Sequence, residues 1–314
     1  MTERVVSAER PRRTAVIGAT LLCIGLPPLL VLAGAASHYA ENRTSGTIRT
    51  SAGQTREYVL HVPPNYDGNR PVPLVISIHG AMNSPAFQMA LSNWNVLADE
   101  QGFIVVYPAG TGGGPKIWQF EGLDERRRDA PDVVFVSELI DTLERTYNID
   151  RARIYANGLS NGGGATYVLS CTLADRIAAF GPLASAVTES IDWCETPAPV
   201  IAFHGTADPF TPYDGAKVWL APKPFPSIPE WIGGWARRNG CATSPVDSAL
   251  NAQVTRREYP ACAAADTQLY TVKGAGHQWF GGTQGPEWLL GPFTRSVDAT
   301  RVMWSFFQRH PLRQ

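Results

Sequence analysis

Ser160 lies in the segment GLSNG (158–162), where a β-rich run gives way to a helical pattern. Glycines on both sides of a serine let the chain turn sharply without Cβ clashes, and such a turn raises the hydroxyl above a sheet. The helix that follows directs its N-terminal N–H groups at the same place, where they can stabilise an oxyanion. A phosphate-binding loop is the alternative, but no Gly-Lys-Ser/Thr sequence follows. The segment therefore predicts Ser160 as a catalytic nucleophile.

A serine hydroxyl needs a general base, and the base needs an acid that orients it. His277 follows the last predicted strand in the segment VKGAGHQWF, on a loop that two glycines loosen. A solvated surface histidine is the alternative, but the presence of Ser160 favours the base. The other histidines lie in the N-terminal segment, in or directly after strands, or at the chain end: His38, His61, His79, His204 and His310.

The orienting acid is predicted to be Asp208, which directly follows the penultimate strand in AFHGTADPFTPYDG. Asp214 lies six residues further on and is the alternative. The resulting chain order, serine then aspartate then histidine, is the order expected when this chemistry is carried by an α/β-hydrolase fold.

An oxyanion hole needs two backbone donors. Asn161 N–H comes directly after the nucleophile, and Ala81 N–H lies in the segment HGAMNS after a central strand. His79 and Gly80 would shape that turn, and an ordinary strand end is the alternative. We therefore predict Ala81 and Asn161 as the oxyanion donors.

The elements that must position these residues alternate along the chain. Apolar residues at helical spacing predict helices over 87–101 and 132–150, and a helix over 295–310 closes the chain. This alternation favours an α/β protein whose mostly parallel, doubly wound sheet has helices on both faces. Continuous apolar runs predict buried strands at 74–80, 102–108, 153–158, 177–184, 199–205 and 268–274.

The first 37 residues have the features of a targeting segment. Four arginines precede the uncharged residues 14–37, which end in small residues, as at a signal-peptidase site. A cleaved signal peptide is favoured over an uncleaved anchor, which needs about 20 residues to span, because two prolines interrupt the stretch. Residues 38–314 are predicted to form one catalytic domain of an exported protein, either secreted or held in the periplasm or cell envelope.

Composition excludes several classes of protein. Hydrophobic residues make up 44% of the chain, which is enough for a sizeable core and argues against disorder. The formal net charge of −1 gives no electrostatic case for binding nucleic acid or, apart from the N-terminal segment, an anionic membrane. The oligomeric state is left open.

The cysteines become informative once export is assumed. Removal of Cys23 with the leader leaves four cysteines, which in an oxidising compartment suggest two disulfides with three alternative pairings. Pairing of nearest neighbours gives Cys171–Cys194 and Cys241–Cys262; buried free thiols are the alternative. A metal site is not expected, because no two cysteines lie close together and no histidine shares their surroundings.

The chain resembles the secreted esterases that group polyhydroxybutyrate-depolymerase-like enzymes with feruloyl and acetylxylan esterases. The resemblance covers residues 47–309 and rests on VISIHG, DVVFVSELIDTLERTYNID, RIYANGLSNGG, HGTADPFTPYDG and YTVKGAGHQWF. It implies an α/β-hydrolase fold and a carboxylic ester hydrolase that needs no cofactor, with Ser160, Asp208 and His277 as nucleophile, acid and base. Phe280 follows Trp279 where the family usually has proline, which puts the substrate rim in doubt.

His79, Trp118 and Trp279 flank the predicted site and are expected to contact the substrate; for the tryptophans, packing in the core is the alternative. The predicted function is hydrolysis of carboxylic esters, such as hydroxyalkanoate oligomers, feruloyl or other aryl esters, or acetyl esters, through an acyl-enzyme. A serine peptidase or amidase on the same fold is the alternative. A non-catalytic binding protein is less favoured, because no member of the triad is missing.

Overall fold

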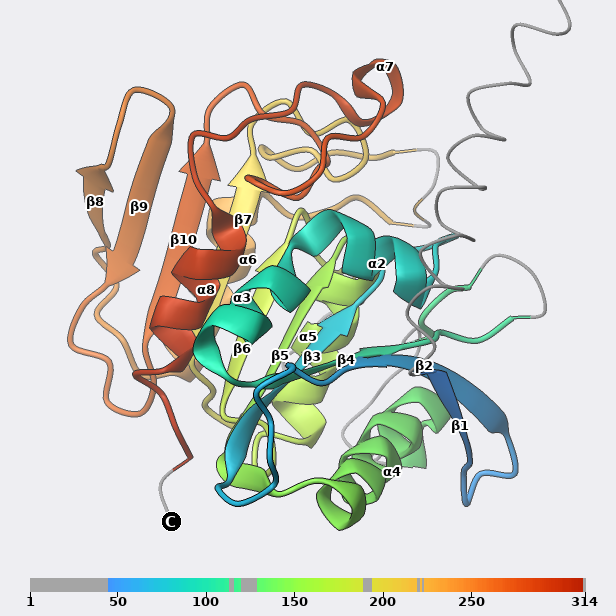
Figure 1. The fold of residues 1–314 in the computed structure, drawn as a ribbon. Coiled ribbons are helices and arrows are strands. Elements are labelled where there is room, and N and C mark those ends of the chain that lie inside the picture. Colours follow the sequence, from blue (N-terminus) through green and yellow to red (C-terminus); the bar gives the residue numbers. More distant parts are fainter. Residues whose placement is uncertain are drawn as a thin grey trace, which may run out of the picture. The chain divides into compact units, whose positions relative to one another are not determined.

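A ten-stranded sheet forms the centre of the protein (Figure 1), in the order β1-β2-β4-β3-β5-β6-β7-β10-β9-β8. The computed structural model describes residues 45–112, 116–119, 129–188, 194–218, 221 and 223–312, so the predicted leader at 1–37 lies outside the described residues. The strands are β1 (Ser45–Arg49), β2 (Thr55–His61), β3 (Val72–Ile78), β4 (Ile104–Pro108), β5 (Ile149–Leu159), β6 (Ala179–Leu183), β7 (Val200–Gly205), β8 (Val246–Ala249), β9 (Val254–Tyr259) and β10 (Thr267–Val272).

The middle of the sheet is parallel, as the sequence predicts. Strands β4, β3, β5, β6, β7 and β10 each run parallel to the next. Two antiparallel strands extend the sheet at each end. The carboxyl ends of the six parallel strands therefore share one edge, where ligands meet sheets of this kind.

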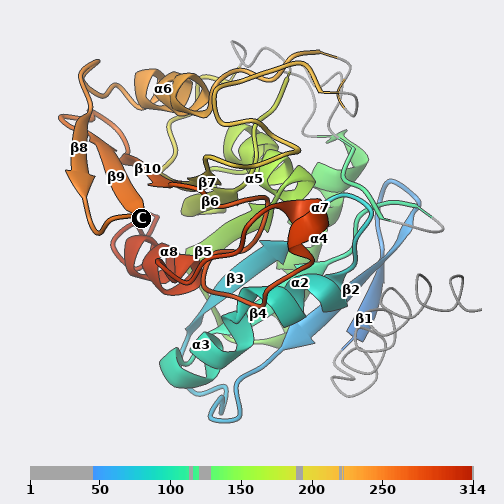
Figure 2. The same cartoon turned by 90° about the horizontal axis from the view of Figure 1, so that it is seen from above.

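Helices cover both faces of the sheet (Figure 2). One face packs against α2, α3 and α8, whereas the other packs against α4, α5 and α6. On β3, Val75 belongs to the first core and Leu74 and Ile76 to the second, and all three side chains are fully buried. The helices are α2 (Pro85–Ser92), α3 (Trp94–Gln101), α4 (Pro131–Thr146), α5 (Asn161–Thr172), α6 (Ile228–Arg238), α7 (Glu287–Leu290) and α8 (Ala299–Phe307).

The helix predicted over 132–150 is confirmed for most of its length, but it ends at Thr146. Tyr147 takes an extended conformation, with φ −126° and ψ 149°. Its ring packs edge-on against Tyr66, and Ile149 already pairs with Val72 as the first residue of β5. Sheet pairing therefore overrides the helical pattern at this end.

The helix predicted over 87–101 is two helices. Asn93 separates α2 from α3 with φ 57°, a left-handed conformation that asparagine tolerates better than most residues. The break turns Trp94 fully into the core, where its indole N–H donates to Asn157 Oδ1 at 3.0 Å. Burial of this ring explains why the chain bends where the pattern predicts a continuous helix.

Both predicted disulfides are confirmed. Cys171–Cys194 joins the end of α5 to the segment before β7, and Cys241–Cys262 joins the segments that follow α6 and β9. Within the described ranges, no helix combines the length and the apolar character that crossing a bilayer requires.

Candidate active site

Ser160 is the single residue between the end of β5 and the start of α5. Its backbone has φ 56° and ψ −122°, a strained conformation for a residue with a side chain. Ser160 N–H donates to Leu183 O on β6 at 2.9 Å, and Ser160 O accepts the N–H of Gly164 at 3.0 Å. These bonds hold the turn at the carboxyl edge of the sheet, in the form that a nucleophile elbow takes.

Two glycines let this turn form. A Cβ atom on Gly158 would lie 2.3 Å from Gly162 O, because the strand and the helix leave the turn side by side. A Cβ atom on Gly162 would lie 2.4 Å from Ile78 O and 2.5 Å from His79 O, at the end of neighbouring β3. Only glycine fits such close backbone contacts, which explains the spacing that surrounds Ser160.

Asp208 and His277 form a buried pair on the loops after β7 and β10. His277 Nδ1 lies 2.7 Å from Asp208 Oδ2, and the two residues are 7% and 5% exposed. Asp208 Oδ1 accepts the N–H groups of Phe210 and Thr211, both at 2.8 Å. A carboxylate acceptor requires the proton on Nδ1, which leaves Nε2 of His277 as the nitrogen that can accept a proton.

The pKa of Asp208 is set by opposing effects. Burial raises it, but the charge of His277 and the hydrogen bonds from His204 and His277 together lower it well below its usual range. The alternative acid, Asp214, is exposed and has no bond to His277 within the described part of the chain. Geometry therefore selects Asp208 over Asp214 as the partner of His277.

The two loops that carry this pair are held together through their backbones. Thr206 N–H donates to Val272 O at 3.0 Å, and Ala207 N–H donates to Ala275 O at 2.9 Å. A Cβ atom on Gly205 would lie 2.1 Å from Ala275 O, so this close approach depends on glycine. The distance between Asp208 and His277 is thus fixed by main-chain contacts.

Ser160 shares the sheet edge with this pair without bonding to it. His277 bonds to Asp208 and, through its N–H, to Leu290 O, and no hydrogen bond among the described contacts joins it to Ser160. Catalytic hydrogen bonds are often long before substrate binds and tighten in the complex.

Ala81 follows β3 and lies beside Ser160. A Cβ atom on Gly80 would lie 3.4 Å from the Cβ of Ser160, so this loop runs within van der Waals contact of the turn. The N–H of Ala81 has no partner among the described residues, whereas the N–H of Met82 donates to Lys116 O at 2.8 Å. The N–H of Asn161 belongs to the first turn of α5, where N–H groups have no partner inside the helix.

The side chain of Asn161 binds the backbone of Trp118. Its Oδ1 accepts the N–H of Trp118 at 2.8 Å, and its Nδ2 donates to Trp118 O at 3.2 Å. The residue after Ser160 therefore anchors the segment 116–119 against the start of α5.

The three residues expected to contact substrate lie in the interior. His79, Trp118 and Trp279 are 0%, 3% and 1% exposed. The indole of Trp118 donates to His79 O at 3.1 Å, and that of Trp279 donates to Thr300 Oγ1 at 2.8 Å. All three side chains are buried, so direct contact with substrate stays a prediction that burial does not favour.

The ring of His79 packs against that of Trp118, and its hydrogen bonds go to backbone groups. Gly110 N–H donates to Nε2 at 2.9 Å, so the proton sits on Nδ1, which donates to Gly80 O at 2.7 Å. Burial, aided by the charges of Lys116 and Arg56, lowers the pKa of His79 to about 4 against the opposing effect of the Gly80 carbonyl. At neutral pH the ring is therefore uncharged, and its hydrogen bonds support the loop that carries Ala81.

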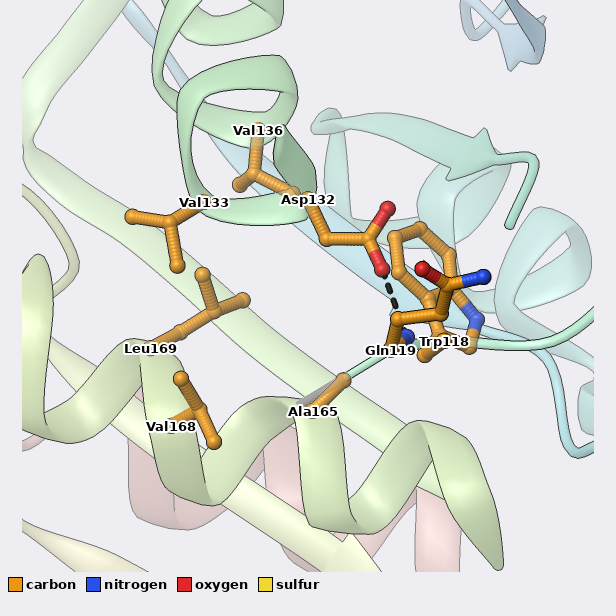
Figure 3. Close-up of a pocket in the computed structure, with 8 residues that line it drawn as sticks. All are labelled: Trp118, Gln119, Asp132, Val133, Val136, Ala165, Val168 and Leu169. Atoms are coloured by element: carbon orange, nitrogen blue, oxygen red, sulfur yellow. Dashed lines mark hydrogen bonds between the residues drawn. The ribbon is translucent and has the colours of Figure 1, made fainter. Parts of the chain in front are cut away.

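A gap between α4 and α5 lies beside Trp118 and Gln119 (Figure 3). It encloses about 10 Å³, which is at the limit for a single water molecule. Asp132 Oδ2 accepts the N–H of Gln119 across its rim at 2.7 Å, and Asp132 Oδ1 lies 2.7 Å from Arg56 Nη1. This gap is a packing defect beside the site and not a place for a substrate.

Sequence reasoning gives no role to His204, yet it lies 3.4 Å from Asp208 Oδ2. The signal that could have found it is its spacing, because it lies next to the end of β7, four residues before Asp208. The structure shows no group of three metal-ligating side chains within its described ranges.

The mostly parallel sheet, the helices on both faces and the strained serine turn after β5 define an α/β hydrolase. The acetyl xylan esterase from Aspergillus awamori has this fold, with a TM-score of 0.55 at 16% identity over 74% of this chain and 94% of that one. An S-formylglutathione hydrolase from Agrobacterium tumefaciens matches with a TM-score of 0.53 at 14% identity, over 85% of this chain and 94% of that one.

The chain belongs to the esterase PHB depolymerase family, whose model matches residues 56–233. A probable feruloyl esterase C from Aspergillus terreus is 26% identical over 256 residues, which cover 79% of this chain and 87% of that protein. The putative esterase NocK from Nocardia uniformis subsp. tsuyamanensis is 30% identical over 255 residues, which cover 74% of this chain and 73% of that protein. The bifunctional acetylxylan esterase/xylanase XynS20E from Neocallimastix patriciarum is 33% identical over 178 residues, and the matched part spans 25% of that relative. The resemblance inferred from the sequence is thus confirmed.

Proposed function

We propose that the protein is an exported serine esterase that hydrolyses carboxylic esters through an acyl-enzyme on Ser160. The observation that carries the proposal is the buried pair of Asp208 and His277, joined at 2.7 Å, on the same sheet edge as the strained serine turn. A buried carboxylate that orients a histidine opposite a serine elbow is the arrangement that acyl transfer requires.

The reaction follows from these positions. His277 Nε2 takes the proton of Ser160 while Oγ attacks the ester carbonyl carbon. The oxyanion of the tetrahedral intermediate accepts hydrogen bonds from the N–H groups of Ala81 and Asn161. The intermediate then expels the alcohol, which takes the proton from His277. Water repeats the sequence on the acyl-enzyme, releases the carboxylic acid and returns the proton to Ser160.

Exposed apolar side chains around the site support esters with apolar or aromatic groups. Trp288 and Leu289 on α7 are 85% and 45% exposed, and Met82, next to Ala81, is 74% exposed. His277 N–H donates to Leu290 O at 2.6 Å, which ties α7 to the loop of the base. Figures 1 and 2 place α7 over the carboxyl edge of the sheet. The names of the relatives point to feruloyl and acetylxylan esters as the first substrates to try.

Export is supported by the two disulfides, because such bonds persist in oxidising compartments and are rare in reducing ones. Whether the protein is secreted or stays in the cell envelope is a part of this proposal that fractionation of the natural host would test.

The proposal is tested with a fluorophosphonate probe and a panel of soluble esters. The wild-type protein should be labelled at Ser160 and should hydrolyse methyl ferulate, aryl acetates or hydroxybutyrate oligomers, whereas Ser160→Ala should do neither. The anilides that match the best esters serve as the control for peptidase activity. Faster cleavage of an anilide than of its ester, or equal labelling of Ser160→Ala, would refute the proposal.

A further inference from the structure

A second buried histidine lies against the carboxylate that orients His277. His204, the penultimate residue of β7, is 1% exposed. Its Nε2 lies 2.8 Å from Thr211 O and 3.4 Å from Asp208 Oδ2. A carbonyl oxygen can only accept a hydrogen bond, so the proton of this ring nitrogen is placed on Nε2. The Nε2–H of His204 therefore points between Thr211 O and the carboxylate of Asp208.

The carboxylate of Asp208 is surrounded by N–H donors on both oxygens. Two backbone N–H groups, those of Phe210 and Thr211, fix Oδ1. The rings of His277 and His204 share Oδ2, at 2.7 Å and 3.4 Å. Donors on both oxygens fix the plane of the carboxylate and stabilise its ionised form.

His204 also closes the turn that carries the acid. Its bond to Thr211 O spans seven residues and joins the end of β7 to the far side of the Asp208 turn. The same turn supplies the N–H of Thr211 to Oδ1, so one residue of the loop meets both His204 and the acid. The position of the carboxylate therefore depends on a donor at the place that Nε2 occupies.

We propose that His204 is a positioning residue for the hydrolytic reaction, which fixes the carboxylate of Asp208 through its Nε2–H and thereby the orientation of His277. The inference rests on the proposed function, because it needs Asp208 and His277 to act as acid and base. His204 touches neither substrate nor Ser160 in this account, and it acts only through Asp208.

The surroundings of His204 allow a matched pair of substitutions. The ring of Tyr213 lies at a centroid distance of 6.1 Å, with its hydroxyl bonded to Thr271 Oγ1 at 2.7 Å, and Thr271 on β10 is the register partner of His204. Glutamine carries its amide nitrogen about as far along the side chain as imidazole Nε2, whereas the amide nitrogen of asparagine stops near the position of Nδ1. His204→Gln thus places an amide N–H donor near the position of Nε2, whereas His204→Asn places the same donor near the position of Nδ1.

The experiment compares kcat and KM of both variants on a soluble aryl ester that the wild type cleaves. His204→Gln should keep kcat within about fivefold of the wild type, and His204→Asn should lose about 100-fold in kcat with KM within about twofold, in the range seen when a catalytic group is misplaced. In an Asp208→Asn background, exchange of His204 for asparagine should have little further effect, since the carboxylate that it positions is gone. Equal losses in the two variants, or no loss in His204→Asn, would overturn the proposal.

A measurement on the wild type keeps the test independent of how the variants fold. Nitrogen-15 NMR of histidine-labelled protein at neutral pH should show the proton of His204 on Nε2, and a proton on Nδ1 alone would overturn the assignment. Failure of the proposed function is distinguishable, because a wild-type protein that cleaves no ester and is not labelled at Ser160 fails before the variants are compared.

Discussion

Two buried histidines in this protein have different partners, which gives them different chemistry. His277 meets the carboxylate of Asp208 at 2.7 Å, and an anion beside the ring stabilises the imidazolium that forms when a base takes a proton. The hydrogen bonds of His79 go to the carbonyl of Gly80 and from the N–H of Gly110, so among the described residues its ring has no carboxylate that would compensate a charge. At the scale of single residues, one ring is therefore suited to carry a proton and the other to stay neutral.

Removal of the negative charge at Asp208 should abolish most of the activity. Asp208→Asn should lower kcat about 10⁴-fold, because an amide favours the wrong tautomer of His277. Asp214→Asn is the matched control, since Asp214 is exposed and lies on the same loop, and it should stay close to the wild type. The reverse result in steady-state ester hydrolysis would show that the acid has been misassigned.

The low pKa of His79 makes stability depend on pH. The unfolded chain, with an ordinary histidine pKa of about 6.5, binds a proton that the folded protein, with its pKa of about 4, does not bind in that interval. Stability is therefore full above pH 6.5 and falls as the pH drops, by about 3 kcal/mol at pH 4 from this group.

Urea unfolding at pH 7.5 and pH 4.5 measures this contribution as the difference between the wild type and His79→Gln. The glutamine variant lacks the titrating ring, so its free energy of unfolding should fall less on acidification. Parallel pH dependence of the two proteins would contradict the assignment of His79 as a buried neutral ring.

At the scale of elements, the site depends on loops that are held by backbone contacts, and glycine makes these contacts feasible. The loops after β7 and β10 meet at Gly205, where a Cβ atom would lie 2.1 Å from Ala275 O. Helix α7 is tied to the second of these loops through the bond from His277 N–H to Leu290 O. The strands fix where each loop begins, and the conformation of the loop then places Asp208 or His277 in the site.

Gly205→Ala should separate the loops that carry Asp208 and His277. The added methyl group has no room, so we expect a loss of about 1–3 kcal/mol of stability together with a fall in kcat. Gly233→Ala in α6 is the control, since its nearest neighbour would be 3.6 Å away, and alanine in a helix should be neutral or stabilising. Thermal unfolding and ester hydrolysis of both variants check this, and equal behaviour of the two would count against the tight contact.

Exposure of Trp288 predicts a role in choosing the substrate. Trp288→Ala should lower kcat/KM for feruloyl or naphthyl esters about five- to tenfold, the size of one aromatic contact, and change that for acetyl esters less than twofold. Val246→Ala is the control, because Val246 is an exposed apolar residue on β8, 54% exposed, at the edge of the sheet. A uniform loss across all esters, or none, would exclude a specific contact with aromatic groups.

At the scale of the whole molecule, the two disulfides constrain chain segments that do not include the loops of Ser160, Asp208 and His277. Their sequence separations are 23 and 21 residues, so the chain-entropy model assigns each about 3 kcal/mol. The double variants Cys171→Ala/Cys194→Ala and Cys241→Ala/Cys262→Ala should each lose about that much in urea unfolding while keeping kcat at low temperature. A loss of kcat that exceeds the loss of folded protein would show that a bridge supports the site directly.

The sequence by itself determined the features that depend on local chain geometry. The glycines around Ser160, the continuous apolar strands and the chain order of Ser160, Asp208 and His277 predict the parallel sheet and the strained turn, because each reflects a short-range steric or burial requirement. The disulfide pairing was not determined in this way: the sequence left three pairings open, and the structure shows the nearest-neighbour one.

Only the tertiary structure decided which side chains meet across the sheet. It paired Asp208 and not Asp214 with His277, broke the helix predicted over 87–101 at Asn93, and buried Trp118 and Trp279, for which the sequence left substrate contact and core packing open. Each of these outcomes depends on contacts between segments far apart in the chain. Local patterns record the conformation of a residue and its tendency to be buried, but its partners are fixed by how the loops pack at the sheet edge.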